Sequence, residues 1–278
     1  MIPFDLDYYA PEKADQAVEI FFSLKEEGRK PLYYAGGTEI ISFCRSQRIT
    51  PDALIDIKNI KDALPLDLDG DDLVYGAALS LSSVAEKGSS AIISEVVKCI
   101  ADRTVRNRLT LGGNICGRLP YREAVLPFLL ADAEILLQGK DGRHKKLLRD
   151  LFDKRLHLEE GDILLQLIVS KNKLNRFGWR KRREKHGPVD YPLYHICSLK
   201  NDGQVKIAVS GLCSFPFRNA ELEKAINDSS IAVKDRVSDS IKKLPGPVRD
   251  DHLGSSVYRE ALWQSDLTEM IERMEVAE

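Results

Sequence analysis

Two glycine-containing stretches decide the fold: Arg106-Asn107-Arg108-Leu109-Thr110-Leu111-Gly112-Gly113-Asn114 and, upstream, the shorter Tyr34-Ala35-Gly36-Gly37-Thr38-Glu39. We call them the second and the first glycine segment. Each carries two adjacent glycines near a threonine. Adjacent glycines permit positive φ and leave backbone N–H groups uncovered, an arrangement that binds phosphate.

A lone Gly-Gly pair is more often a turn or a helix cap. Two such segments, each with a hydroxyl and a further polar side chain, predict one shared anionic ligand.

Neither segment has the spacing of the common nucleotide-binding loops. No Gly-Lys-Ser/Thr follows either glycine pair, and no Gly-x-Gly-x-x-Gly lies between a strand and a helix. Mononucleotide-loop and Rossmann interpretations are therefore disfavoured.

Length and composition favour a folded chain of two domains. Of the 278 residues, 43% are hydrophobic, enough for a sizeable core. The 41 basic residues are balanced by 43 acidic ones, so the net charge of −2 argues against a nucleic-acid partner. The five cysteines are widely spaced, which predicts neither a disulfide framework nor an iron–sulfur site. No leader pattern and no apolar run of membrane-spanning length is found, so we expect a cytoplasmic protein without a membrane span.

Hydrophobic periodicity predicts a mixed α+β fold. The first glycine segment is expected between a strand over 32–35 and a helix over 39–48, whose N-terminus would face the anion. The second glycine segment has no strand pattern and is expected to be a long ordered loop. Further strands are predicted over 53–57, 64–68, 73–77, 133–138, 144–148, 163–170, 191–199 and 204–212, and further helices over 11–28, 91–101, 220–227, 231–243 and 256–274.

A basic run, 176–186, follows residue 172. One interpretation is a solvated strand edge, where cations discourage aberrant strand pairing. The other is a nucleic-acid patch, which the balanced net charge disfavours.

The two glycine segments carry a family resemblance. Ala35–Thr38 and Thr110–Asn114, with the lead-in Val105–Asn107, resemble the two FAD-diphosphate loops of the flavoprotein subunit of molybdenum hydroxylases. That family includes xanthine dehydrogenase and aerobic carbon monoxide dehydrogenase. Other stretches resemble family landmarks in the expected order, so the likeness covers nearly the whole chain: 77–81, 120–130, 161–168, 183–190 and 254–259.

The resemblance implies a fold with defined domains. Residues 1–171 would form an FAD-binding domain of the vanillyl-alcohol-oxidase (PCMH) type, with subdomains of about 1–58 and 59–171. Residues 172–278 would form a smaller α+β domain, an antiparallel sheet plus helices, whose first strand carries the basic run near the flavin cleft.

The resemblance also implies a site that holds FAD non-covalently. Backbone N–H groups of both segments would donate to the diphosphate, each charge-assisted bond contributing about 1.5–3 kcal/mol. Glu123 stands where the family has an aspartate that bonds the cofactor's sugar or ribityl hydroxyls; the alternative is a surface carboxylate that caps or pairs with Arg122. Tyr191 or Trp179 would stack near the isoalloxazine, although a core position is as good an interpretation. No catalytic or metal-ligating residue is predicted, and the expected cofactor-binding set is Ala35, Gly36, Gly37, Thr38, Glu39, Arg106, Thr110, Leu111, Gly112, Gly113, Asn114, Glu123 and Asp190.

The implied function is electron transfer within a complex. Electrons from a molybdopterin centre in a large subunit would pass through [2Fe–2S] clusters in a small subunit to FAD in this chain, and then to NAD⁺ or another acceptor. Two alternatives stay open. A stand-alone flavin oxidoreductase would normally need a larger catalytic domain than the roughly hundred residues after 172. A non-catalytic assembly or regulatory subunit that has lost the flavin is kept open by the departures from the family pattern at Arg118 and Glu123.

Overall fold

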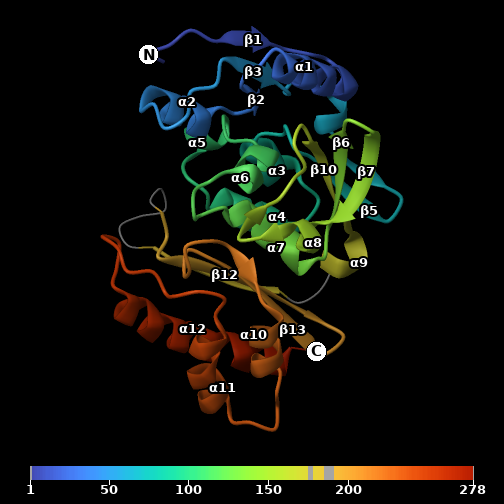
Figure 1. Ribbon diagram of the computed structural model, residues 1–278. Helices are drawn as coiled ribbons and strands as arrows, with labels where there is room; N and C mark the ends of the chain where they lie inside the picture. Colours follow the sequence, from blue (N-terminus) through green and yellow to red (C-terminus); the bar gives the residue numbers. More distant parts are fainter. Residues whose placement is uncertain (1, 175–177, 185–190, 278) are drawn as a thin grey trace.

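The computed structural model describes residues 2–174, 178–184 and 191–277. Three larger sheets follow one another along the described chain, with helices beside each of them, and a short two-stranded sheet makes a fourth (Figure 1). The α+β class is confirmed. Among the described helices, none combines the length and the apolar character needed to span a membrane.

The N-terminal part is a small parallel sheet with two helices. Strands β1 (Asp7–Tyr9), β2 (Pro31–Tyr34) and β3 (Ala53–Asp56) lie in the order β1-β3-β2. Helix α1 (Ala14–Glu26) connects β1 to β2, and its buried residues recur at helical spacing. Helix α2 (Thr38–Arg45) leaves β2 directly after the first glycine segment turns the chain.

The central part is a five-stranded antiparallel sheet in the order β4-β5-β10-β6-β7. Helices between β5 and β6 cover one face, and α1 packs against the other through Leu136, Ile163 and Leu165. The strands are β4 (Leu66–Asp69), β5 (Asp72–Gly76), β6 (Glu134–Gly139), β7 (Gly142–Leu147) and β10 (Ile163–Ser170). The helices are α3 (Leu81–Lys87), α4 (Ala91–Lys98), α5 (Arg103–Arg106), α6 (Leu111–Cys116) and α7 (Leu126–Leu130), with α8 (Leu148–Leu151), α9 (Lys171–Leu174) and the short ribbon β8 (Phe152–Asp153) and β9 (Arg155–Leu156) further along.

The second glycine segment is helical, and the expectation of a long loop was wrong. It spans the end of α5 and most of α6. Thr110 is the N-cap of α6, because its side chain accepts a hydrogen bond from the Gly113 N–H. Two adjacent glycines disfavour a helix, so the cap and the packing of buried Leu111 and Ile115 sustain this short one.

The C-terminal part is a four-stranded antiparallel sheet between the central part and a layer of helices (Figure 1). The strands are β11 (Gly178–Arg183), β12 (Tyr194–Asn201), β13 (Gln204–Ser210) and β14 (Phe217–Arg218), and the helices α10 (Ala220–Ile226), α11 (Val233–Ser240) and α12 (Ser256–Val276). Side chains alternate between its faces. Cys197, Leu199 and Ala208 join the core built around α7, whereas Ile196 and Val209 pack with α10 and α12. The predicted domain boundary at residue 171 stays a prediction, because the core built around α7 contains residues from both sides of it.

Strand β11 shows the same alternation in its charges. Arg180 and Arg182 pair with Glu95 and Glu123 of the central part, at 2.9 and 3.1 Å. Lys181 and Arg183 face the other way and pair with Glu269 and Asp266 of α12. β11 is an edge strand of its sheet, but its four described cations are ion-paired rather than simply solvated. These charges hold the sheet between its two neighbouring layers.

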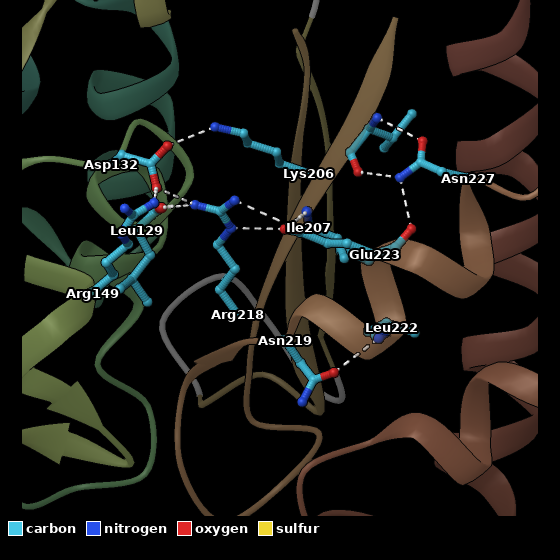
Figure 2. Close-up of polar contacts among 11 residues, drawn as sticks. Leu129, Asp132, Arg149, Lys206, Ile207, Arg218, Asn219, Leu222, Glu223 and Asn227 are labelled. Atoms are coloured by element: carbon cyan, nitrogen blue, oxygen red, sulfur yellow. Dashed lines mark hydrogen bonds and ion pairs between the residues drawn. The ribbon is translucent and has the colours of Figure 1, made fainter.

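A second ionic contact joins the sheet to the central part at Asp132 (Figure 2). Its carboxylate accepts from Lys206 at 2.7 Å and Arg218 at 2.6 Å, and Arg149 lies 3.2 Å away. Arg218 lies between this carboxylate and Glu223, to which its Nε donates at 2.7 Å. Burial alone would raise the pKa of Asp132, but Lys206 and Arg218 outweigh it and hold that pKa below its ordinary value.

We predict that Asp132→Asn lowers the free energy of unfolding by about 1–3 kcal/mol at pH 7, because the half-buried cations Lys206 and Arg218 lose an anionic partner. Asparagine tolerates the positive φ of 47° at this position, so the charge is the main change. A carboxyl with a lowered folded pKa stabilises the fold above its unfolded pKa of about 3.9 and loses this contribution as the pH falls through the folded pKa. The difference between wild type and variant in urea unfolding should therefore shrink at pH 3. Asp141→Asn, in the exposed turn before β7, is the matched control, and equal effects of the two variants would contradict the assignment.

Candidate functional site

The two glycine segments touch each other. A Cβ built on Gly36 would stand 2.0 Å from the Arg108 carbonyl oxygen and 3.3 Å from the Thr110 nitrogen. Only glycine permits so close an approach between two backbones. Figure 1 accordingly shows α2 beside α5 and α6, although the segments are about seventy positions apart in sequence. The structure thus brings together the residues from which a shared ligand was predicted.

The first glycine segment presents uncovered backbone donors. Gly37 has a φ of 71° and is the N-cap of α2, with no side chain capping the helix. The N–H groups of Gly36, Gly37 and Thr38 have no hydrogen-bond acceptor within the described residues. An uncapped helix N-terminus carries partial positive charge. The segment therefore offers three adjacent donors to an anion.

The second glycine segment uses most of its amides internally. Gly112 N–H donates to Ala77 O at 2.7 Å, Gly113 N–H to Thr110 Oγ1 at 3.2 Å and Asn114 N–H to Thr110 O at 2.9 Å. The expectation that these three amides donate to a ligand is corrected, because they belong to a capped helix rather than to a loop. The N–H of buried Leu111 is likewise bonded, to Leu79 O.

Thr110 supplies the free donor of this segment. It forms an isolated antiparallel bridge with Ser80, in which the hydrogen bonds are made by the neighbouring residues. The N–H of Thr110 consequently points away from Ser80. It has no acceptor within the described parts of the chain, and it lies next to Gly36. Four free amides, three from the first segment and one from the second, thus lie at or next to the contact between the two segments.

Polar side chains of the predicted site brace the segments. Glu39 accepts from the N–H groups of Arg118 at 2.9 Å and Leu119 at 3.2 Å, which fixes the turn after α6 onto α2. Asn114 Oδ1 accepts from the Ala124 N–H at 3.2 Å. Arg106 donates to the carbonyls of Ile100 and Ala101, at the end of α4. These three side chains are engaged with the protein. Asp190 lies outside the described residues.

Lys58 and Ala35 complete the first segment. Buried Ala35 accepts a hydrogen bond on its carbonyl from Lys58 Nζ at 2.9 Å. Sequence reasoning missed Lys58. The position of Lys58 just after a parallel strand was the available clue, because ligands of parallel sheets bind at the carboxyl ends of the strands.

Glu123 is buried at the contact between the central part and the C-terminal sheet, with 2% of its surface exposed. Its Oε1 accepts from Arg182 Nε at 3.1 Å and lies 2.8 Å from Nδ1 of fully buried His195. The alternative of a surface carboxylate paired with Arg122 was wrong. A bond from Glu123 to the cofactor stays a prediction. Sequence reasoning missed His195 as a partner, because nothing local relates residues 72 positions apart.

Two tyrosines stack beside this contact. The rings of Tyr121 and Tyr191 lie 4.6 Å apart at 17°, and the Arg249 guanidinium lies 4.7 Å from the Tyr121 ring centre. Burial raises the pKa of Tyr191, and Glu39 and Glu123 raise it further, so this half-exposed ring lies near both carboxylates. Trp179 is buried in the core of the C-terminal part, as the core interpretation had it.

The donor set fits a diphosphate. The four free amides donate and none accepts, and the nearby charges include Lys58 beside Ala35 and exposed Arg108. A diphosphate carries two negative charges and only acceptor oxygens, so it matches this arrangement. The stacked rings of Tyr121 and Tyr191 lie near Glu39. They offer an aromatic surface to a planar ring system on that side of the site.

Known proteins share this sequence and fold. Over 175 residues the chain is 27% identical to the carbon monoxide dehydrogenase medium chain of Hydrogenophaga pseudoflava, an alignment covering 61% of this chain and 60% of that relative. It is 25% identical over 272 residues to the glyceraldehyde dehydrogenase medium chain of Sulfolobus acidocaldarius, covering 93% and 94%.

Solved structures match along nearly the whole length. Carbon monoxide dehydrogenase from Hydrogenophaga pseudoflava superposes with a TM-score of 0.82 at 23% identity, covering 97% of this chain and 96% of that one. Quinoline 2-oxidoreductase from Pseudomonas putida 86 gives 0.83 at 18% identity, covering 99% and 98%. At these identities the likeness establishes the fold.

The family model described as the FAD binding domain in molybdopterin dehydrogenase matches residues 3–171, which is more than half of the chain. This range contains both glycine segments and the four free amides. The chain therefore belongs to that family of FAD-binding domains, and the match covers both the N-terminal and the central part.

Proposed function

We propose that this chain is the FAD-carrying, electron-transferring subunit of a multi-subunit molybdenum hydroxylase. The observation that carries the proposal is the backbone contact of Gly36 with Arg108 and Thr110, which gathers free N–H donors at one place. We assign the FAD diphosphate to Gly36, Gly37, Thr38 and the N–H of Thr110. Of the rest of the predicted cofactor-binding set, we assign a bracing role to Glu39, Arg106, Asn114 and Glu123, whose side chains are bonded to the protein.

The relatives support a division of labour between subunits. They are named medium chains or FAD-subunits of dehydrogenases for carbon monoxide, glyceraldehyde and nicotinate. Because subunits of one type serve such different substrates, we assign substrate choice to another chain. The partners we propose are a molybdopterin-binding large subunit and a [2Fe–2S] small subunit, assembled in the cytoplasm.

The protein's own part in the chemistry is to bind and orient. Bound FAD would supply the redox chemistry, the transfer of electrons from an iron–sulfur partner to NAD⁺, as the resemblance to xanthine dehydrogenase implies, or to another acceptor. The amides of the first glycine segment neutralise the diphosphate as it leaves water. Tyr191 and Tyr121 provide an aromatic surface near the carboxylates of Glu39 and Glu123.

A second candidate function is a flavin-free assembly subunit. It is favoured by the internal bonding of Glu39, Asn114 and Glu123, side chains that the family resemblance assigns to the cofactor. A colourless purified protein that takes up no added FAD would support this candidate.

We predict that Gly36→Ala lowers the FAD content of the purified protein at least about tenfold, because its methyl group pushes the two segments apart. Overpacking of this kind costs about 1–3 kcal/mol, so a small fall in melting temperature accompanies it. Gly203→Ala, in the turn between β12 and β13, is the control for destabilisation alone: an added Cβ meets nothing within 4 Å, and the positive φ of 76° supplies a strain cost away from the two segments. Unchanged flavin absorbance in a folded Gly36→Ala protein would contradict the diphosphate assignment.

The partners and the acceptor are tested on the assembled complex. We predict that the tagged chain, expressed with its native genomic neighbours, co-purifies with a molybdenum protein and an iron–sulfur protein. Stopped-flow mixing of the reduced complex with NAD⁺ should reoxidise the flavin, whereas reoxidation by a quinone alone would assign a different acceptor. A yellow chain that turns over a substrate without partners would instead establish the stand-alone oxidoreductase.

A further inference from the structure

Lys58 has been given no role in the site so far, but its side chain contacts the first glycine segment. It follows β3 by two positions, and its side chain is 42% exposed. Its Nζ donates to the Ala35 carbonyl at 2.9 Å and contacts the Asp56 carboxylate. The same ammonium lies 4.4 Å from the centre of the Tyr34 ring, a cation–π distance. Lys58 therefore contacts both residues that precede the glycine pair, Tyr34 and Ala35.

The hydrogen bond to Ala35 fixes the direction of the next amide. The Ala35 carbonyl and the Gly36 N–H belong to one peptide unit, which is planar and trans because the described chain has no cis peptide bond. In a trans unit the C=O and the N–H point in opposite directions. A carbonyl that is held toward Lys58 aims the Gly36 N–H away from it. That N–H is one of the free donors of the site.

The Tyr34 ring fixes the second glycine in the same way. A Cβ on Gly37 would stand 2.3 Å from the Tyr34 hydroxyl oxygen, so the ring packs directly under the Gly37 backbone. Lys58 lies on the ring's face and restrains it. The lysine thus supports both glycines, one through a hydrogen bond and one through an aromatic ring.

Asp56 holds Lys58 in this place. Its carboxylate is 4% exposed and accepts from the Lys58 backbone N–H at 2.9 Å and from the Tyr8 hydroxyl. The hydrogen bond to Asp56 raises the pKa of Tyr8 to about 12, in keeping with a hydroxyl that donates to this carboxylate. These hydrogen bonds fix the carboxylate of Asp56, and the fixed carboxylate in turn keeps the ammonium of Lys58 in place.

We propose that Lys58 is the positioning residue of the FAD site, which aims the Gly36 amide at the diphosphate and keeps Gly37 in its left-handed conformation. The proposal rests on the proposed function, since it concerns the same site. It predicts that substitution of Lys58 weakens the binding only of ligands that contain the diphosphate.

The test titrates the full FAD-free chain with two ligands, FAD and riboflavin, and follows both titrations by flavin fluorescence. Riboflavin has the same ring system as FAD but no phosphate. Lys58→Met should raise the Kd for FAD about 10- to 100-fold, the loss expected for one charge-assisted contact. The riboflavin Kd should stay within about threefold, and Lys58→Arg should restore FAD binding to a similar margin. Lys61→Met, an equal change of charge at an exposed position, is the control and should leave both constants unchanged.

A second measurement reads the position of the amide without a ligand. In amide NMR spectra of the FAD-free chain, the Gly36 resonance should shift in Lys58→Met and stay in place in Lys61→Met. If circular dichroism shows that Lys58→Met does not fold, Lys58→Gln replaces it with the same expectations.

Three results would overturn the role of Lys58: an unchanged FAD Kd in a folded Lys58→Met protein, an equal loss of riboflavin binding, or an equal effect of Lys61→Met. Wild-type protein that takes up no FAD would overturn the functional proposal itself. In that case the amide spectra still test the positioning role by themselves, because a Gly36 resonance that does not shift in Lys58→Met would exclude it.

Discussion

The structure depends on one close contact between backbones, that of Gly36 with the carbonyl of Arg108. A side chain of any size at Gly36 would separate α2 from the segment that begins α6, and the two belong to the N-terminal and the central part. The N–H groups of Gly36 and Thr110 lie at this contact, and neither has an acceptor among the residues that the structure describes. Unpaired amides are costly where water is excluded. A site that keeps several of them together is therefore built for an acceptor that the protein does not supply.

The C-terminal sheet is held by charges around an apolar centre. Cys197, Leu199 and Ala208 continue the core of the central part, and acids of that part lie around this contact. Glu95, Glu123 and Asp132 each meet cations of the sheet. These ion pairs fix the register of β11, since a one-residue slip would turn its arginines to the wrong face. The apolar centre supplies most of the stability, and the charges set the position of the sheet.

Local sequence sufficed where local rules decide the structure. The strand–glycine–helix order of the first segment follows from hydrophobic periodicity and from two glycines, and the hairpins follow from their turn residues. The helical state of Leu111–Cys116 was out of reach, because two glycines argue against a helix and only the packing around Leu111 and the cap of Thr110 reverse that preference. The pairing of Glu123 with His195 and Arg182 was equally hidden, since it depends on how two sheets meet.

The second glycine segment connects the two halves of the molecule. Its start contacts Gly36, and four residues after Thr110 the side chain of Asn114 bonds the Ala124 amide. Ala124 follows Glu123, whose carboxylate is bonded to the C-terminal sheet. Each step is a hydrogen bond, a backbone contact or a link between neighbouring residues, so an unbroken series of contacts joins the first glycine segment to His195. Because the second segment has committed its own amides to this framework, the donors for an anion have to come chiefly from the first. That accounts for the uncapped N-terminus of α2, whereas α6 begins with the side-chain cap of Thr110.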